Sequence, residues 1–186
     1  MRYRRLGSTE LMVSEIGLDA RALLAAGEDT AEVTIRAAIA LGVTVLAWTV
    51  SDASEDVEPL IARAAGVDLG RLTLVARLDL VPAPEDVGPQ VEAVASRLGS
   101  GVTLAAFPGA LGPEAHAAFE EARERDVVRF AALDSGATIE VPDGRIAEAR
   151  PGAISAALQA PGVACALVQV ADPGDLRALI GEGATV

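Results

Sequence analysis

The sequence contains no lysine, and its 15 basic residues are all arginine. It has one histidine (His116), one tyrosine (Tyr3) and one cysteine (Cys165), and aromatic residues make up only 3% of the chain. A single cysteine and a single histidine exclude disulfide frameworks, zinc fingers and cysteine–histidine nucleophile pairs. No metal site is therefore expected.

The chain also has few positive charges for its number of negative ones. Its formal net charge is −12, and its pI is about 4.4. Nucleic-acid binding depends on clustered cations, so this balance disfavours a nucleic-acid partner and an anionic membrane surface. The apolar runs have strand length rather than the roughly 20 residues that a bilayer needs, and no basic leader precedes an apolar segment. We expect a cytoplasmic protein without a membrane partner.

What the sequence does contain is a regular alternation of apolar strand-like runs and helix-like segments. A length of 186 residues with 51% hydrophobic residues suits a single domain over residues 1–186. The alternation predicts an α/β fold with right-handed parallel crossovers. The strands are expected at 13–18, 43–48, 71–78, 102–107, 127–133 and 164–170.

Two segments depart from this alternation. A hairpin is predicted around Gly7 and Ser8, ahead of the first strand. Further along, Thr138–Val141 followed by the turn Pro142-Asp143-Gly144 is typical of a short hairpin. A sixth strand and a contact between two copies of the chain are the alternatives for 138–145, and the structure of 136–150 is left open.

Four stretches of the sequence resemble the aldo-keto reductase family. The opening RYRRLGSTELMVSEIGL is similar to the family's N-terminal hairpin and first strand, and TAEVTIRAAIALGVTVLAW with the following SED resembles its next unit. RDVVRFAALDS resembles the fifth strand, and ISAALQAPGVACALVQVADPGDLRALI the last helix, strand and helix. The match is most specific over residues 1–64.

The resemblance implies a (β/α)8 barrel with its site at the C-terminal ends of the strands. Only about six of the eight strands are recognisable, and the block for the sixth and seventh is not. We therefore predict an incomplete or rearranged TIM-type barrel of about six parallel strands with an N-terminal β-hairpin. Because a gap would expose strand edges, either the barrel is rearranged or a partner chain covers it, and a homodimer is expected.

The family reduces carbonyls with NADPH, using a tyrosine whose proton affinity is tuned by a lysine and an aspartate, with a histidine that orients the substrate. By resemblance, the aspartate position holds Ala47, the tyrosine position Asp52, the lysine position Arg77 and the histidine position Phe107. No change of alignment can supply a lysine that the chain lacks, and Tyr3 lies in the opening hairpin. Arginine is a poor substitute, because it keeps its proton at all accessible pH values.

Cofactor binding is expected to be lost as well. The family anchors nucleotide phosphates partly on the backbone amides that open the last helix, where a glycine and a serine are usual. This chain has Gln169 and Asp172 there, and an anionic cap competes with phosphate for the same amides. We predict no cofactor.

Polar residues nevertheless follow most of the predicted strands, and in a barrel they meet on one face. The candidate ligand-binding residues are Asp19, Arg21, Trp48, Asp79, Phe107 and Gln169. The alternative is a purely structural role, in which the acidic residues cap helices or form ion pairs at the rim of the barrel. Trp48 has two further alternatives, as core filling or as an interface anchor.

Three functions remain open from the sequence. The first is a redox-inactive relative that binds a small molecule or a partner chain at the barrel mouth or an exposed sheet edge. The second is a non-redox enzyme, such as a lyase, isomerase, dehydratase or cyclase, with Asp52 or Asp134 as base and Arg77 holding an anionic group. The third is an unconventional NADPH-dependent reductase.

Overall fold

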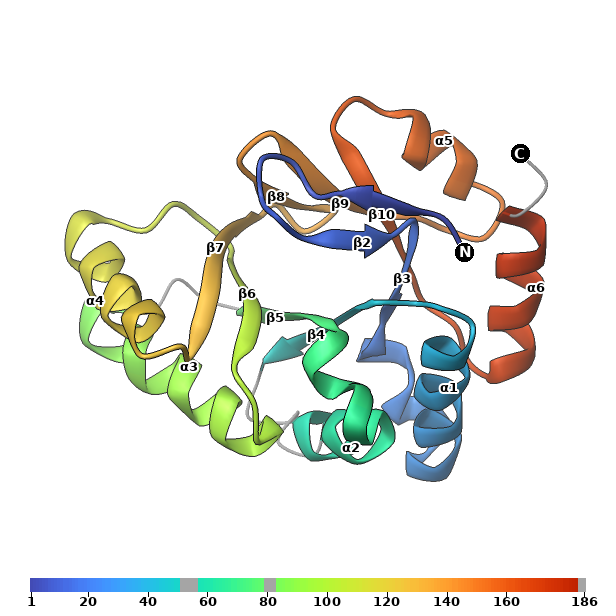
Figure 1. Cartoon of the computed structure of the whole chain (residues 1–186), viewed down its shortest axis with the longest axis horizontal. Coiled ribbons are helices and arrows are strands. Elements are labelled where there is room, and N and C mark those ends of the chain that lie inside the picture. The colour runs from blue at the N-terminus through green and yellow to red at the C-terminus, as the bar shows by residue number, and fades with distance from the viewer. Residues whose placement is uncertain (51–56, 79–82, 184–186) are drawn as a thin grey trace.

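A computed structural model describes residues 1–50, 57–78 and 83–183 (Figure 1). After an N-terminal hairpin, strands and helices alternate from residue 16 as far as the fourth helix, as the sequence predicts. None of the described helices is long and apolar enough to cross a bilayer. The strands and helices are β1 (Tyr3–Arg5), β2 (Met12–Ser14), β3 (Ile16–Asp19), α1 (Glu28–Ala40), β4 (Val45–Val50), α2 (Val57–Ala65), β5 (Thr73–Leu78), α3 (Pro84–Leu98), β6 (Val102–Phe107), α4 (Pro113–Glu124), β7 (Val128–Asp134), β8 (Thr138–Val141), β9 (Gly144–Glu148), α5 (Ile154–Gln159), β10 (Val163–Val168) and α6 (Pro173–Gly183).

The strands β3 to β10 close into a barrel in the order β10-β3-β4-β5-β6-β7-β8-β9. All neighbouring strands are parallel except β8, which is antiparallel to both β7 and β9. The β8–β9 hairpin therefore occupies the width of two strands without a helix between them. The predicted rearranged barrel, the N-terminal hairpin and the hairpin within 136–150 are confirmed. About six parallel strands were expected, and the barrel has eight strands, of which β8 is antiparallel to both neighbours; the β8–β9 hairpin closes the gap.

The burial of the strands follows from what covers them. β5, β6 and β10 are buried at every position, because the barrel interior covers one face and helices cover the other. Figure 1 shows the helices around the outside of the barrel. No helix joins β7 to β8 or β8 to β9, and in the hairpin Ile139, Val141 and Ile146 are buried while their neighbours are more exposed. This period of two is the signature of a strand with one free face.

The N-terminal hairpin closes one end of the barrel. β1 and β2 pair antiparallel, and Val13 of β2 together with Leu6 and Leu11 between the strands belongs to the same apolar cluster as the barrel interior. The turn of this hairpin also rests on the β8–β9 turn, where the amide of Ser8 donates to the carbonyl oxygen of Pro142 at 3.1 Å. The hairpin thus connects the first residues of the chain to the strands that complete the barrel.

This contact between two turns requires glycine on both sides. A Cβ added at Gly144 would lie 2.4 Å from the amide nitrogen and 2.6 Å from the Cα of Gly7. Gly7 itself has a φ of +57°, in the left-handed region. Backbone atoms on both sides cannot move aside as a flexible side chain would.

We therefore expect Gly144→Ala to lower the free energy of unfolding by about 2 kcal/mol through overpacking. Urea denaturation followed by circular dichroism measures the change. Gly70→Ala is the matched control, since a Cβ at Gly70 meets open space, and it should change stability by no more than ~0.5 kcal/mol. Equal effects of the two substitutions would show that the two turns are not in close contact.

Candidate functional site

The inner face of the barrel is apolar up to the C-terminal ends of the strands, where it becomes charged. The last apolar residues on the inner face of four strands are Val75, Ala132, Ile146 and Leu167. Side chains of a strand alternate between its faces, so the residue two positions further on again faces inward. These next residues are Arg77, Asp134, Glu148 and Gln169. Asp19 follows Gly17 by two positions and therefore also faces inward. A Cβ at Gly17 would meet the inward-facing side chains of Cys165 and Val45.

Arg77 is at the centre of these groups. Its Nε donates to Oδ2 of Asp134 at 2.7 Å, and its Nη2 donates to Oδ1 of Asp134 at 3.0 Å. The same Nη2 donates to the carbonyl oxygen of Gly136 at 2.7 Å, and Nη1 donates to Oε1 of Glu148 at 2.5 Å. Only 5% of the Arg77 side chain is exposed. A buried guanidinium with this bidentate geometry is held in one orientation.

A second arginine extends the network toward the first strand. Arg21, on a 3-10 turn directly after β3, donates from Nε to Oδ2 of Asp19 at 2.7 Å and from Nη2 to Oε1 of Glu148 at 2.5 Å. Nε2 of Gln169 donates to Oδ2 of Asp19 at 3.3 Å, and Nη1 of Arg77 lies 3.8 Å from that oxygen. We call Asp19, Arg21, Arg77, Asp134, Glu148 and Gln169 the mouth network. Two guanidiniums and three carboxylates give it a formal charge of −1.

The two arginines of the network keep their protons. Burial alone would lower the pKa of Arg77, but its hydrogen bonds to Asp134 and Glu148 outweigh burial and raise that pKa above the ordinary value. The hydrogen bond to Asp19 likewise raises the pKa of Arg21. Both carboxylate oxygens of Asp134 already accept hydrogen bonds, one of them also from the amide of Gly136 at 2.8 Å. The arrangement therefore suits binding and orientation better than proton transfer.

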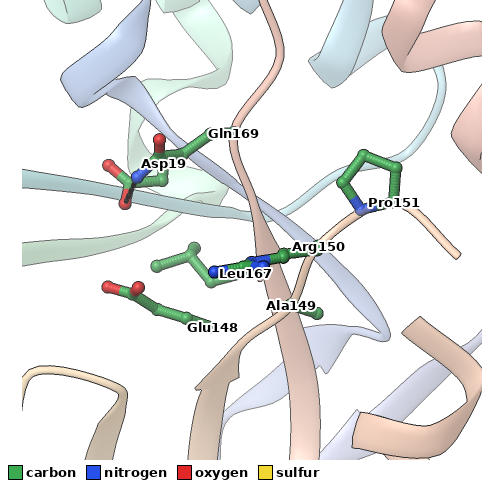
Figure 2. Close-up of a pocket in the computed structure, with 7 residues that line it drawn as sticks. All are labelled: Asp19, Glu148, Ala149, Arg150, Pro151, Leu167 and Gln169. Atoms are coloured by element: carbon green, nitrogen blue, oxygen red, sulfur yellow. Dashed lines mark hydrogen bonds between the residues drawn. The ribbon is translucent and has the colours of Figure 1, made fainter. Parts of the chain in front are cut away.

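A pocket of about 350 Å³ opens beside the network (Figure 2). Its lining combines part of the mouth network with an apolar side and one further cation. The lining residues are Asp19, Glu148, Ala149, Arg150, Pro151, Leu167 and Gln169. Figure 2 shows the Arg150 side chain extending toward the side on which the carboxylates of Asp19 and Glu148 lie. A concave site of this size and mixed character suits a small polar molecule.

Two of the expected ligand-binding residues lie elsewhere. Trp48 and Phe107 belong to the outer apolar cluster between the barrel and the helices. Nε1 of Trp48 donates to Oε1 of the buried Glu58 on α2 at 3.0 Å, and Phe107 packs edge-to-face against Phe119 of α4. This placement corrects the expectation that both side chains line the mouth. Trp48 and Phe107 each follow an inward-facing residue, Ala47 and Ala106. Because neighbouring side chains of a strand point to opposite faces, these two point outward toward the helices.

The outcome for the other candidates is mixed. The structure brings Asp19, Arg21, Arg77, Asp134 and Gln169 together, as the convergence of strand ends predicts. Asp52 and Asp79 lie outside the described residues. Sequence reasoning missed Glu148 and Arg150, which follow the hairpin turn in the stretch that had been left open. One signal for Glu148 was available: it follows the apolar Ile146 by two positions, so in a strand both side chains face the same side.

The residues present do not fit a bound NADPH in the manner of the family. Oδ1 of Asp172 accepts from the amides of Gly174 and Asp175, at 2.6 and 3.0 Å, at the start of α6. The carboxylate thus takes the amides that a phosphate would need, and it adds a repelling charge. Ala47, at the expected aspartate position, lies in the apolar interior.

We expect Arg77→Met to lower the free energy of unfolding by about 3 kcal/mol or more, because it leaves the carboxylate of Asp134 buried without its partner. Urea denaturation measures the loss, and Asp134→Leu added to Arg77→Met should restore part of it. Arg63→Met is the control, since Arg63 also pairs with two carboxylates, those of Glu28 and Glu32, but at the surface. A loss at Arg77 no larger than at Arg63 would contradict the described network.

Comparison with known proteins finds similar structures but no similar curated sequence. No family model matches the sequence, and no curated protein matches it. Among solved structures, an aldo-keto reductase of Bacillus halodurans in its holo form is 20% identical, with a TM-score of 0.65, and the match covers 98% of this chain and 63% of that one. The chain thus spans less than two thirds of the length of that enzyme.

Two further structures give the same result. A Pseudomonas aeruginosa protein assigned to the aldo-keto reductases has 16% identity and a TM-score of 0.73, with 98% of this chain and 94% of that chain covered. A Klebsiella pneumoniae aldo-keto reductase in complex with NADPH has 21% identity and a TM-score of 0.59, with 71% and 49% covered. The resemblance noted in the sequence is thereby confirmed for the fold: this chain has the aldo-keto reductase fold, with a β-hairpin in place of two strand–helix units.

Proposed function

We propose that this chain is a redox-inactive protein of aldo-keto reductase fold that binds a small polar molecule at the C-terminal mouth of its barrel. The observation that carries the proposal is Arg77. By the resemblance of the sequence it takes the family's lysine position, it is held by Asp134 and Glu148, and its partner Glu148 lines a pocket of about 350 Å³. The closed barrel offers no open edge within the described residues, so the mouth is the favoured surface.

The proposed loss of redox chemistry rests on what the site can do with protons. The only tyrosine, Tyr3, lies in β1 at the other end of the barrel, where its hydroxyl donates to the carbonyl oxygen of Gly42 at 3.1 Å. The sequence has no lysine to lower the pKa of a tyrosine, and the raised pKa of Arg77 removes it as a proton carrier. A carbonyl substrate would find no proton donor of the family's kind.

The two other functions have less support. A non-redox enzyme with Asp134 as its base would have to break the bidentate ion pair with Arg77 before the carboxylate could take a proton. Asp52, the other proposed base, lies outside the described residues. An NADPH-dependent reductase would need the α6 amides that Asp172 occupies. A homodimer and a cytoplasmic location stay as proposals. The homodimer was expected because an open sheet edge would need a partner, and the closed barrel removes that reason.

Addition of NADPH to the purified protein tests the redox part of the proposal. We expect no mass increase in native mass spectrometry, no change in NADPH fluorescence, and no NADPH oxidation with a panel of aldehydes and ketones. One NADPH bound per chain, with oxidation that depends on an added carbonyl compound, would contradict the proposal.

The binding part is tested by thermal unfolding in the presence of a library of small polar molecules. At least one compound class should raise the unfolding temperature further as its concentration is increased, because a ligand that binds only the folded state stabilises it. The effect should be weakened by Arg150→Gln, which alters the pocket, but not by Arg5→Gln, which alters an exposed arginine of β1. No stabilisation by any class would contradict binding at the mouth.

A further inference from the structure

The pocket beside the mouth network retains polar groups that the protein itself does not use. Arg150 is exposed, and its guanidinium has no ion pair or hydrogen bond with the described residues. Glu148 accepts from Arg21 and Arg77 through Oε1 alone, so its Oε2 has no partner there. Gln169 donates to Asp19 through Nε2, and its Oε1 accepts from no group in the described parts of the chain. The pocket therefore presents a cationic donor on one side and anionic or neutral acceptors on the other.

The charges of these groups balance. The mouth network has a formal charge of −1, and Arg150 adds +1, so together they are neutral. A ligand with a single charge could pair with only one of the two charged sides of the pocket. A ligand that is neutral overall but carries both signs can pair with Arg150 and with Glu148 at once. Leu167, Ala149 and Pro151 supply an apolar side for its carbon skeleton.

We infer that the ligand class of this pocket is a small zwitterion with a carboxylate and a protonated amine, the pattern of an α-amino acid. The carboxylate pairs with the planar guanidinium of Arg150, which suits two parallel hydrogen bonds. The ammonium donates to Oε2 of Glu148 and to Oε1 of Gln169. This inference rests on the proposed function, because it names the ligand for the same site.

A thermal-shift and calorimetry series with the whole chain tests the inference. A panel of α-amino acids is measured first. The tightest binder is then compared with its carboxylic acid lacking the amine, its amine lacking the carboxylate, and its N-trimethyl derivative, which keeps both charges but has no N–H to donate. We expect the amino acid to bind and each of the three analogues to bind roughly tenfold more weakly or worse.

Variants then locate the binding. Arg150→Gln should weaken the amino acid roughly tenfold or more while leaving the unfolding temperature of the free protein unchanged, since Arg150 has no partner to lose. Arg5→Gln, at the opposite end of the barrel, should leave the affinity unchanged. An affinity equally insensitive to both substitutions would place the amino acid outside this pocket and overturn the inference.

The series also separates this inference from the function it rests on. If simple carboxylates, amines or neutral polyols bind as well as amino acids and Arg150→Gln weakens them, the mouth is a binding site but the zwitterion assignment is wrong. If no compound of any class shifts the unfolding temperature, both the inference and the proposed function are wrong.

Discussion

The ion pair between Arg77 and Asp134 determines what the mouth of this barrel can do. It joins β5 to β7, and the contact of Arg77 with Glu148 adds β9, so strands that are not neighbours in the sheet are linked across the opening. Hydrogen bonding raises the pKa of Arg77, which keeps the guanidinium charged and fixed in place. Arg77 therefore acts as a structural cation in this mouth.

The β8–β9 hairpin makes this arrangement available. At one end, its turn packs glycine against glycine on the N-terminal hairpin, and the two together close that end of the barrel. At the other end, β9 delivers Glu148 to the mouth network, and Arg150 follows two residues later at the edge of the pocket. The hairpin that closes the barrel therefore also brings charged residues to its mouth.

Much of this fold could be predicted from the sequence, because strands covered on both faces form continuous apolar runs. The same continuity is why the faces of Trp48 and Phe107 were misplaced: a run without polar alternation does not reveal which side chains point inward. Arg77, Asp134 and Asp19 could be found because they follow such runs. Glu148 was harder to find, because β9 has its place in the barrel through its pairing with both β8 and β10, and the pairing with β10 is a long-range contact that its own five residues do not encode.

Nuclear magnetic resonance of the arginine Nε–H groups tests the central claim most directly. A buried Arg77 that donates from Nε to Asp134 should give one Nε–H signal that exchanges slowly with solvent, and Arg77→Lys should remove that signal and no other slowly exchanging one. The same spectrum should be unchanged by NADPH. If all arginine Nε–H groups exchange rapidly, or if the slow signal survives Arg77→Lys, Arg77 is not the fixed centre of the mouth.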